Sequence, residues 1–280
     1  MASPGARPDP AAAGRTGAQS RAAAVQARQL EVAYGTRLAL CDADFTIPDG
    51  ALTVLIGSNG SGKSTLMNAV AGLVEPSSGE LSVLGAAGPA RPGQAAYVLQ
   101  STQTDALLPI SVEEVVTMAR FSTRGFVGRL DAADRRAVAG AMERMEISDI
   151  ASRRVSQLSG GQHQRVLVAQ GLAQDAEILL LDEPVTGLDL VSRRRIVSAI
   201  LEERDTGRCI VLASHDLDDA RIADHVVLLA GRVVAEGAAD VALARENLRA
   251  AYGHRHLDLE DGGRAMVDDR HGHGWSSAGR

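Results

Sequence analysis

The sequence predicts an α/β fold with a mostly parallel sheet, an antiparallel β piece at its start and a helical subdomain in its middle. Three observations lead to this prediction. Short apolar runs typical of buried strands alternate with amphipathic helical segments, as in parallel sheets covered by helices on both faces. The earliest strand-like segments alternate apolar and polar residues, which favours antiparallel pairing. From about residue 107 to 165, helical periodicity replaces the strand patterns.

The first elements follow from their periodicity. Residues 29–34 and 38–47 alternate as strands do, and a Pro-Asp-Gly turn signal follows at 48–50. Residues 51–57 form an apolar run of strand length. Residues 63–73 then follow helical spacing, with Leu66, Val70 and Leu73 on the apolar face.

The middle of the chain is predicted to be helical. Residues 111–120 open with Ser111 and Glu114, the pair of a capping box at a helix start. A second helix is predicted over residues 135–147, with three apolar side chains on one face. They are Val138, Met142 and Met145.

The last part returns to the alternation of strands and helices. Residues 177–182 and 209–214 have buried-strand patterns, and residues 194–203 between them form an amphipathic helix. Residues 225–237 are predicted to form a hairpin.

Both ends of the chain are expected to lie outside the folded domain at 28–242. Residues 1–27 are mainly Ala, Gly, Pro and Arg, which predicts a disordered arm, with a targeting peptide as the alternative. Residues 243–280 gain Gly, His and Asp, which predicts a short helix and then a largely flexible tail.

Composition limits the function. The formal net charge of −6 argues against nucleic acid as the main partner, because phosphate binding usually leaves a basic excess. No apolar run reaches the roughly 18–20 residues of a membrane helix. Cys41 and Cys209 are far apart in apolar stretches, so we expect reduced, buried thiols in a cytoplasmic protein.

A glycine-rich loop supplies the first functional motif. Residues 57–64, GSNGSGKS, match the whole pattern G-x-x-x-x-G-K-[ST] between a predicted strand and helix. The glycines let backbone N–H groups point at phosphate oxygens, and the helix adds the positive end of its dipole. The core is therefore predicted to be that of a P-loop NTPase. The residues expected to contact the nucleotide here are Gly57, Ser58, Asn59, Gly60, Ser61, Gly62, Lys63, Ser64 and Thr65.

Lys63 is the only lysine in a chain with 29 lysine and arginine residues in total. A slim ammonium can lie along the loop and reach the β- and γ-phosphates, whereas a wider, planar guanidinium would fit poorly. Ser64 offers its hydroxyl to Mg²⁺.

A carboxylate pair supplies the second motif. Asp182 and Glu183 follow the buried strand at 177–182, at the sheet edge where ligands of open α/β folds bind. We expect Asp182 to hold Mg²⁺ through water and Glu183 to polarise an attacking water as general base.

Further motifs resemble those of the ABC-type ATPases, in the family's order. Together with the phosphate loop they cover about residues 30–237. They are VAYGTRLAL at 32–40, YVLQ at 97–100, LSGGQHQR at 158–165, EPVTGLD at 183–189 and ASHD at 213–216.

The resemblance implies roles for these residues. Two subunits would sandwich two ATP molecules, with residues of the signature motif acting in trans and Asp189 bridging the interface. His215 would contact the γ-phosphate, and Gln100 would reach the metal and the water. Tyr34 would stack on adenine, although core packing of this aromatic side chain is the alternative. The residues of the signature motif expected to act in trans are Ser159, Gly160, Gly161 and Gln162.

The resemblance also implies partners. The chain would bind an integral-membrane permease from the cytoplasmic face of the cell membrane, in a system that includes an extracytoplasmic solute-binding protein. Residues 97–120 and 169–184 look most like those of zinc or manganese importers. Iron-chelate importers, exporter cassettes and soluble non-transport ABC ATPases are the alternatives. Four tail histidines have a spacing that fits no standard zinc site, so they are interpreted as part of a solvated tail, with weak metal binding as the alternative. They are His254, His256, His271 and His273.

Overall fold

The computed structural model describes residues 22–99, 109–121, 130–253, 256–258 and 264–266. Its centre is a six-stranded sheet in the order β10-β9-β3-β8-β7-β6, in which all neighbours are parallel except β9 and β10. The strands are β3 (Leu52–Ile56), β6 (Ala95–Val98), β7 (Ile178–Asp182), β8 (Cys209–Ser214), β9 (His225–Leu229) and β10 (Val233–Gly237). The predicted parallel core and the predicted hairpin over 225–237 are confirmed.

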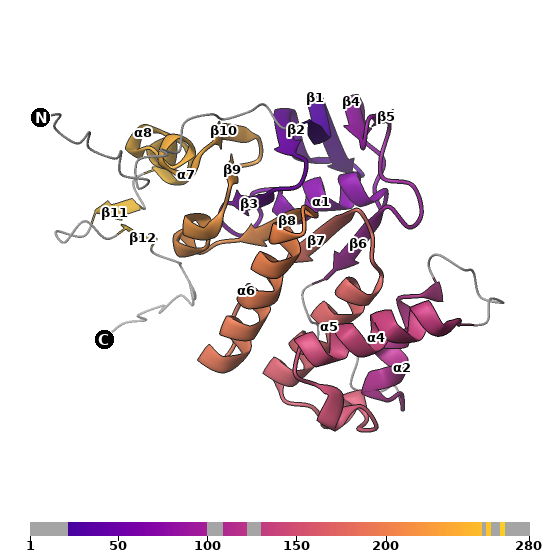
Figure 1. The fold of residues 1–280 in the computed structure, drawn as a ribbon. Helices are drawn as coiled ribbons and strands as arrows, with labels where there is room; N and C mark the ends of the chain where they lie inside the picture. Colours follow the sequence, from indigo (N-terminus) through magenta and orange to yellow (C-terminus); the bar gives the residue numbers. More distant parts are fainter. Residues whose placement is uncertain (1–21, 100–108, 122–129, 254–255, 259–263, 267–280) are drawn as a thin grey trace, which may run out of the picture.

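An antiparallel sheet in the order β2-β1-β4-β5 lies beside the first sheet (Figure 1). Its strands are β1 (Ala23–Tyr34), β2 (Arg37–Pro48), β4 (Ser78–Val83) and β5 (Ala86–Ala87). The sequence predicted the first two strands only. The strand β4 escaped notice because its first three residues are polar or glycine and exposed, so its apolar alternation is only two residues long.

The start of the domain is a correction. The strand β1 begins at Ala23, inside the stretch 1–27 expected to be disordered, and Val25 and Ala27 are buried. The sequence did not predict this start because it is rich in alanine, which has a low β-propensity.

The helices fall into two groups. The helix α1 (Lys63–Ala71) packs between the two sheets, and α6 (Leu190–Asp205) covers the other face of the parallel sheet. The predicted helical subdomain contains α2 (Val112–Met118), α4 (Ala132–Arg144) and the first part of α5 (Gly160–Ala173). These three helices lie together at the lower right of Figure 1, so the helical group extends past the predicted end at 165. Short 3₁₀ segments join them at Ser148–Ile150 and Val155–Gln157.

Several helix predictions can be compared with this arrangement. The capping box of Ser111 and Glu114 is confirmed, and Val138, Met142 and Met145 are buried as predicted. The helix α1, however, ends at Ala71, because Gly72 adopts φ +76 in the left-handed region. Leu73 therefore lies outside the helix and is 62% exposed, contrary to the prediction.

The end of the domain differs from the prediction in part. The helix α7 (Ala239–Ala242) is followed by α8 (Arg245–Tyr252), which is the short helix predicted after residue 242, but its Leu248 is fully buried in the core. The folded unit therefore extends past the predicted boundary at 242. Two short strands, β11 (His256–Asp258) and β12 (Arg264–Met266), pair within the stretch expected to be a tail.

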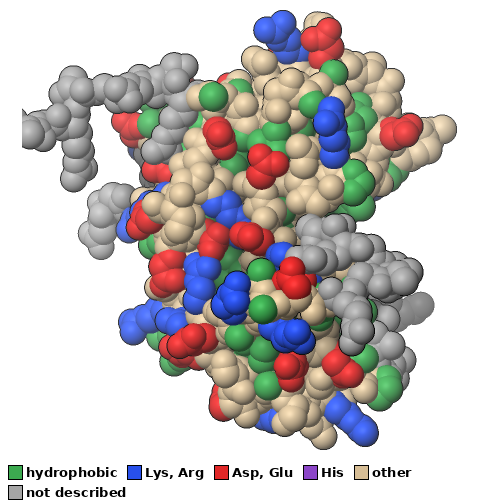
Figure 2. All heavy atoms as spheres, turned by 45° about the vertical axis from the view of Figure 1, so that its right-hand side comes forward, with side chains coloured by type: hydrophobic (Ala, Val, Ile, Leu, Met, Phe, Trp, Pro, Cys, Tyr) green, Lys and Arg blue, Asp and Glu red, His purple; other side chains and the backbone are tan. Residues whose placement is uncertain are grey.

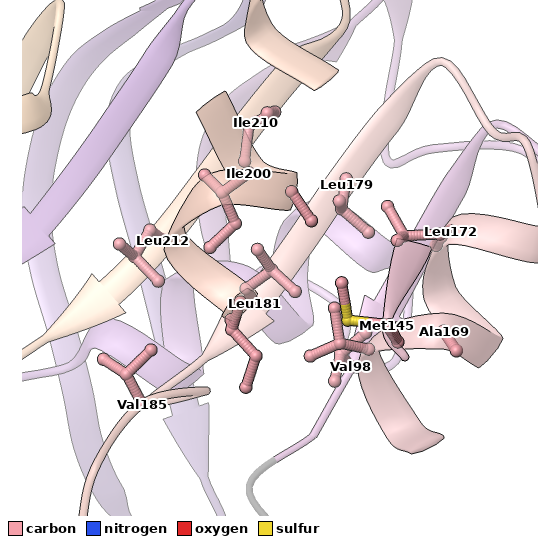
Figure 3. Packing of buried hydrophobic residues seen from close by; sticks show 14 of the residues in the cluster. Val98, Met145, Ala169, Leu172, Leu179, Leu181, Val185, Ile200, Ile210 and Leu212 are labelled. Atoms are coloured by element: carbon pink, nitrogen blue, oxygen red, sulfur yellow. The ribbon is translucent and has the colours of Figure 1, made fainter. Parts of the chain in front are cut away.

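Two apolar cores lie on opposite faces of the parallel sheet. Along β7 and β8, Leu180 and Val211 face α1, whereas Leu179 and Ile210 face α6 and the helical subdomain. Figure 3 shows part of the second core, to which Val98, Met145 and Leu181 belong. Because both faces of these strands are covered, each strand is a continuous apolar run rather than an alternating one.

Two other expectations concern the cysteines and the membrane. Both thiols are free, but only Cys209 is buried, and Cys41 is partly exposed. Burial raises the pKa of Cys209 to about 12. In the ranges that the structure describes, no helix is both long and apolar enough to cross a bilayer.

Gly171 is predicted to be essential for the contact between α5 and β6. A Cβ atom there would lie 2.4 Å from Cγ2 of Val98, so Gly171→Ala should lower the free energy of unfolding by about 1–3 kcal/mol in urea titrations. Gly140→Ala on α4 is the control, since its Cβ would meet nothing within 4 Å. It should stabilise by about 0.5–1 kcal/mol, and equal effects of both changes would contradict the packing argument.

Candidate nucleotide-binding site

The site forms where three parallel strands end side by side. Ile56 of β3 pairs with Ser214 of β8, and Asp182 of β7 pairs with Ala213. The segments that leave these strands therefore start at the same edge of the sheet. They bring the phosphate loop, the carboxylate pair and His215 together, as the sequence predicted.

The phosphate loop is held in a tight bend. Gly57 leaves no room for a side chain, because a Cβ atom would lie 2.5 Å from the carbonyl oxygen of Leu229. Gly62 has φ +101, a conformation that favours glycine. The buried hydroxyl of Ser61 makes no hydrogen bond within the described residues. Ser58, Asn59, Gly60 and Ser64 are exposed, so the loop is open to a ligand at the start of α1.

Lys63 lies inside this loop. Its Nζ donates hydrogen bonds to the carbonyl oxygens of Gly57 at 2.7 Å and Ser58 at 3.2 Å, and Oε1 of Glu183 is 3.9 Å away. The side chain is only 5% exposed. Burial lowers the pKa of Lys63, although the carboxylates of Glu183 and Asp182 oppose this shift.

Glu183 is held in a strained conformation. Its φ of +48 lies in the left-handed region, which is uncommon for a residue other than glycine and typical of functional sites. Its backbone N–H donates to the carbonyl oxygen of Ala213 at 3.1 Å. Thr186 Oγ1 donates to Oε2 at 3.2 Å, and Nδ1 of His215 lies 3.5 Å from the same oxygen. The strained turn thus aims this carboxylate at His215 and Lys63.

Asp182 has a neighbour that the sequence did not single out for a role. The Tyr97 hydroxyl on β6 donates to Oδ2 of Asp182 at 3.4 Å, and Asp182 is 7% exposed. Burial, together with the charge of Asp182, raises the pKa of Tyr97, so the phenol keeps its proton and remains a donor.

The signature residues form a second cluster at the starts of α5 and α6. Ser159 caps α5 and forms a capping box with Gln162. Asp189 caps α6, accepting hydrogen bonds from the backbone of Val191 and Ser192; these bonds lower the pKa of Asp189. A Cβ atom on Gly161 would lie 2.7 Å from Oδ2 of Asp189, so the two helix starts touch within one chain.

Of two further residues predicted for the site, the structure describes Tyr34 but not Gln100. Tyr34 is 46% exposed, and its hydroxyl accepts a hydrogen bond from Nδ2 of Asn68 on α1 at 3.3 Å. This excludes the core-packing alternative. Gln100 lies outside the described residues, as do the side chains of the four tail histidines.

The sequence missed a polar cluster beside His215. It consists of Arg193, Ser214, Asp216 and Asp219. No periodicity or motif identified Asp219, because it lies in a 3₁₀ turn (Leu217–Ile222) after the strand. Arg193 looks in the sequence like one more cation of an amphipathic helix.

Comparisons with known proteins agree with this geometry. Residues 40–186 match the family model described as ABC transporter. The manganese transport system ATP-binding protein MntA of Synechocystis is 36% identical, over 78% of this chain and 85% of that protein. The zinc transport system ATP-binding protein TroB of Treponema pallidum is 37% identical, over 83% and 88%. The chelated iron transport system membrane protein YfeB of Yersinia pestis is 37% identical, over 82% and 79%.

Solved structures show the same fold. A putative metal-chelate type ABC transporter in an inward-facing conformation has a TM-score of 0.71 at 22% identity, covering 88% of this chain and 98% of that one. A bacterial ABC transporter cassette solved as a dimer has a TM-score of 0.68 at 26% identity, covering 77% and 98%.

Lys63→Arg is expected to weaken ATP binding although it keeps the charge. The guanidinium is too wide for the space between the loop carbonyls and Glu183. Loss of one charge-assisted hydrogen bond, about 1.5–3 kcal/mol, corresponds to roughly 10- to 100-fold weaker binding, measurable by titration with a fluorescent ATP analogue. Arg91→Lys, at an exposed position, is the control for the exchange itself. Unchanged affinity in Lys63→Arg would contradict this reading of the loop.

Proposed function

This chain belongs to the ABC transporter family, and from that premise we propose that it is the ATP-hydrolysing subunit of a transporter that imports a metal ion, zinc or manganese. The observation that supports hydrolysis is the meeting of Lys63, Glu183 and His215 at the sheet edge where Asp182 ends β7. The cargo is supported by the manganese and zinc systems to which the relatives belong.

The phosphate loop would bind the β- and γ-phosphates of ATP. The N–H groups at the start of α1 and the helix dipole attract the anion. On binding, Lys63 would exchange the carbonyl oxygens of Gly57 and Ser58 for phosphate oxygens. Tyr34, exposed beside α1, is available to stack on the adenine.

The residues at this edge suit Mg²⁺. Mg²⁺ prefers oxygen ligands and usually keeps several waters and substrate phosphates in its shell. The hydroxyl of Ser64 and the carboxylate of Asp182 offer such oxygens, and the sequence adds Gln100. Within the described residues no cluster of three or more His, Cys, Asp or Glu side chains is placed to hold a metal ion. The ion would neutralise phosphate charge.

Hydrolysis would depend on Glu183 and His215. Glu183 is the candidate general base, because its strained turn brings the carboxylate to His215. His215 would hold the attacking water and the γ-phosphate in place. In such phosphoryl transfer, positioning and charge stabilisation supply most of the rate enhancement.

Two copies of the chain would complete two ATP sites. The start of α5, with Ser159, Gly160, Gly161 and Gln162, offers N–H groups and a hydroxyl to a phosphate of the partner's nucleotide. Beside it Leu190 and Val191 are 72% and 69% exposed, which supports an interface next to Asp189. The dimeric cassette among the similar structures supports the same arrangement.

The transporter would also need a permease and an extracytoplasmic solute-binding protein. Leu99, which follows β6, and Met118, at the end of α2, are 56% and 52% exposed. Each is a candidate for contact with a cytoplasmic helix of the permease. The chain would then lie peripherally on the cytoplasmic face of the cell membrane. On the face in Figure 2, basic and acidic side chains are interspersed, which supports our inference that nucleic acid is not a partner.

Other cargoes have specific support. The chelated iron relative is as similar as the zinc relative, at 37% identity each. An iron-chelate importer is therefore the second candidate. An exporter cassette and a soluble non-transport ABC ATPase are alternatives that the experiments below separate.

Glu183→Gln is expected to bind ATP, to lose most of its hydrolysis and to accumulate as an ATP-bound dimer, because the amide cannot take a proton from water. A general base contributes about 10²–10⁴-fold, so phosphate release should fall by that order. Size-exclusion chromatography with Mg-ATP would detect the dimer. Hydrolysis at the wild-type rate would exclude Glu183 as the base.

The same variant can identify the membrane partner. Purified from gently solubilised native membranes with Mg-ATP, it should retain a polytopic membrane protein in near-equal amount. Lys63→Arg is the matched control, because weaker ATP binding should reduce this retention. Recovery of soluble proteins or ribosomes alone would favour the non-transport alternative.

Deletion of the gene is expected to lower cellular zinc or manganese when that metal is scarce. Elemental analysis would measure the metal content of the deleted strain. The same strain complemented with the wild-type gene or with Glu183→Gln would be measured beside it. A fall in iron alone would favour the iron-chelate system, and a rise in metal would favour an exporter. Unchanged metal content would contradict metal import.

A further inference from the structure

We propose that Arg193 and Asp219 are positioning residues for His215, and that they couple the position of its imidazole to the position of the start of α6. The inference rests on the role proposed above for His215. It concerns the cluster formed by Arg193, Ser214, Asp216 and Asp219, which we call the histidine support.

The histidine support fixes the backbone on both sides of His215. Before it, the hydroxyl of Ser214 donates to Oδ2 of Asp219 at 2.6 Å. After it, the backbone N–H of Asp216 donates to the same hydroxyl at 3.0 Å. Ser214 is 3% exposed, so water competes little for these bonds. The turn that presents His215 to Glu183 is thus closed by one buried hydroxyl.

Asp219 anchors this hydroxyl to α6. Its carboxylate is 5% exposed and accepts a hydrogen bond from Nη2 of Arg193 at 2.8 Å. The same Nη2 donates to Oδ2 of Asp216 at 3.1 Å. A buried carboxylate without its cation would be strongly destabilised, so Asp219 and Arg193 constrain each other's position.

The helix start connects the histidine support to the second cluster of the site. The backbone N–H of Arg193 donates to the carbonyl oxygen of Asp189 at 3.0 Å, one helical turn away, and Asp189 touches Gly161. A displacement of the α5 and α6 starts, as when a second nucleotide approaches Gly161, would therefore reach His215 through Arg193. This gives each chain a short physical connection between its two halves of the dimeric sites.

An exposed pair in the same 3₁₀ turn offers a control. Nε of Arg221 lies 3.2 Å from Oδ1 of Asp218, and the two side chains are 79% and 68% exposed. Such a surface pair contributes little, and it does not join the histidine support to α6.

The first test compares kinetics in the full-length chain. Asp219→Asn and Arg193→Gln should lower kcat for ATP hydrolysis on the order of 10- to 100-fold with the affinity for ATP unchanged, and Arg221→Gln should leave both unchanged. In a His215→Ala background, Asp219→Asn should cause no further loss, because both changes remove the same function. An equal loss in both backgrounds, or an unaffected kcat, would overturn the inference.

The second test needs no hydrolysis, so it separates this inference from the proposed function. The chain has seven histidines, and labelling them with ¹⁵N allows the His215 imidazole signal to be assigned by its loss in His215→Ala. Asp219→Asn and Ser214→Ala should shift that signal, whereas Arg221→Gln should not. Ser214→Ala leaves the ion pair intact and keeps the test valid if Asp219→Asn fails to fold. An unmoved His215 signal in Ser214→Ala would refute the support role, even if the wild-type chain hydrolyses ATP.

Discussion

The parallel alignment of β3, β8 and β7 is the constraint on which the rest of the structure depends. Their hydrogen-bond register brings Ile56, Ser214 and Asp182 to one edge. Lys63, Glu183 and His215 lie in the segments that follow these residues. The strands are buried on both faces, so their polar extensions can leave only at the ends. Apolar burial therefore fixes where the charges meet.

Burial of these charges has consequences for the site. Lys63 and Asp182 are both under 10% exposed, and a buried charge requires partners. In the structure described here, Lys63 is satisfied by the loop's own carbonyl oxygens, and Glu183 by Thr186 among others. Nucleotide phosphates would offer Lys63 a stronger, charged acceptor than the carbonyl oxygens. The loop thus holds a cation in place at the open start of α1.

The second cluster, at the starts of α5 and α6, is the part of the site that would face a second copy of the chain. The starts of α5 and α6 touch through Gly161 and Asp189, yet their outer surfaces are exposed, including Leu190 and Val191. In the proposed dimer, one chain would therefore carry one half of a phosphate site at the ends of its strands and another half at these helix starts. The histidine support lies between the two halves, in contact with both the turn of His215 and the first turn of α6.

The sequence by itself determined the motifs and helices or strands that are specified by residues close together in the chain. A phosphate loop needs glycine, lysine and serine at fixed spacing, and a buried strand ending in Asp182 and Glu183 is visible as an apolar run followed by charge. Capping boxes at Ser111 and apolar helix faces such as that of Val138 are equally local. It did not determine β4 or the early start of β1, because alanines and short polar strands are stabilised by their partner strand rather than by their own pattern.

Only the tertiary structure decided which distant side chains meet. Tyr97 reaches Asp182 because β6 and β7 are neighbours in the sheet, and Arg193 reaches Asp219 because α6 packs beside the end of β8. Hydrophobic periodicity predicts which face of a helix or strand is apolar. It does not predict which other helix or strand packs against that face. The residues proposed to do chemistry were therefore visible in the chain, whereas those that hold them in place were selected by packing between elements far apart in sequence.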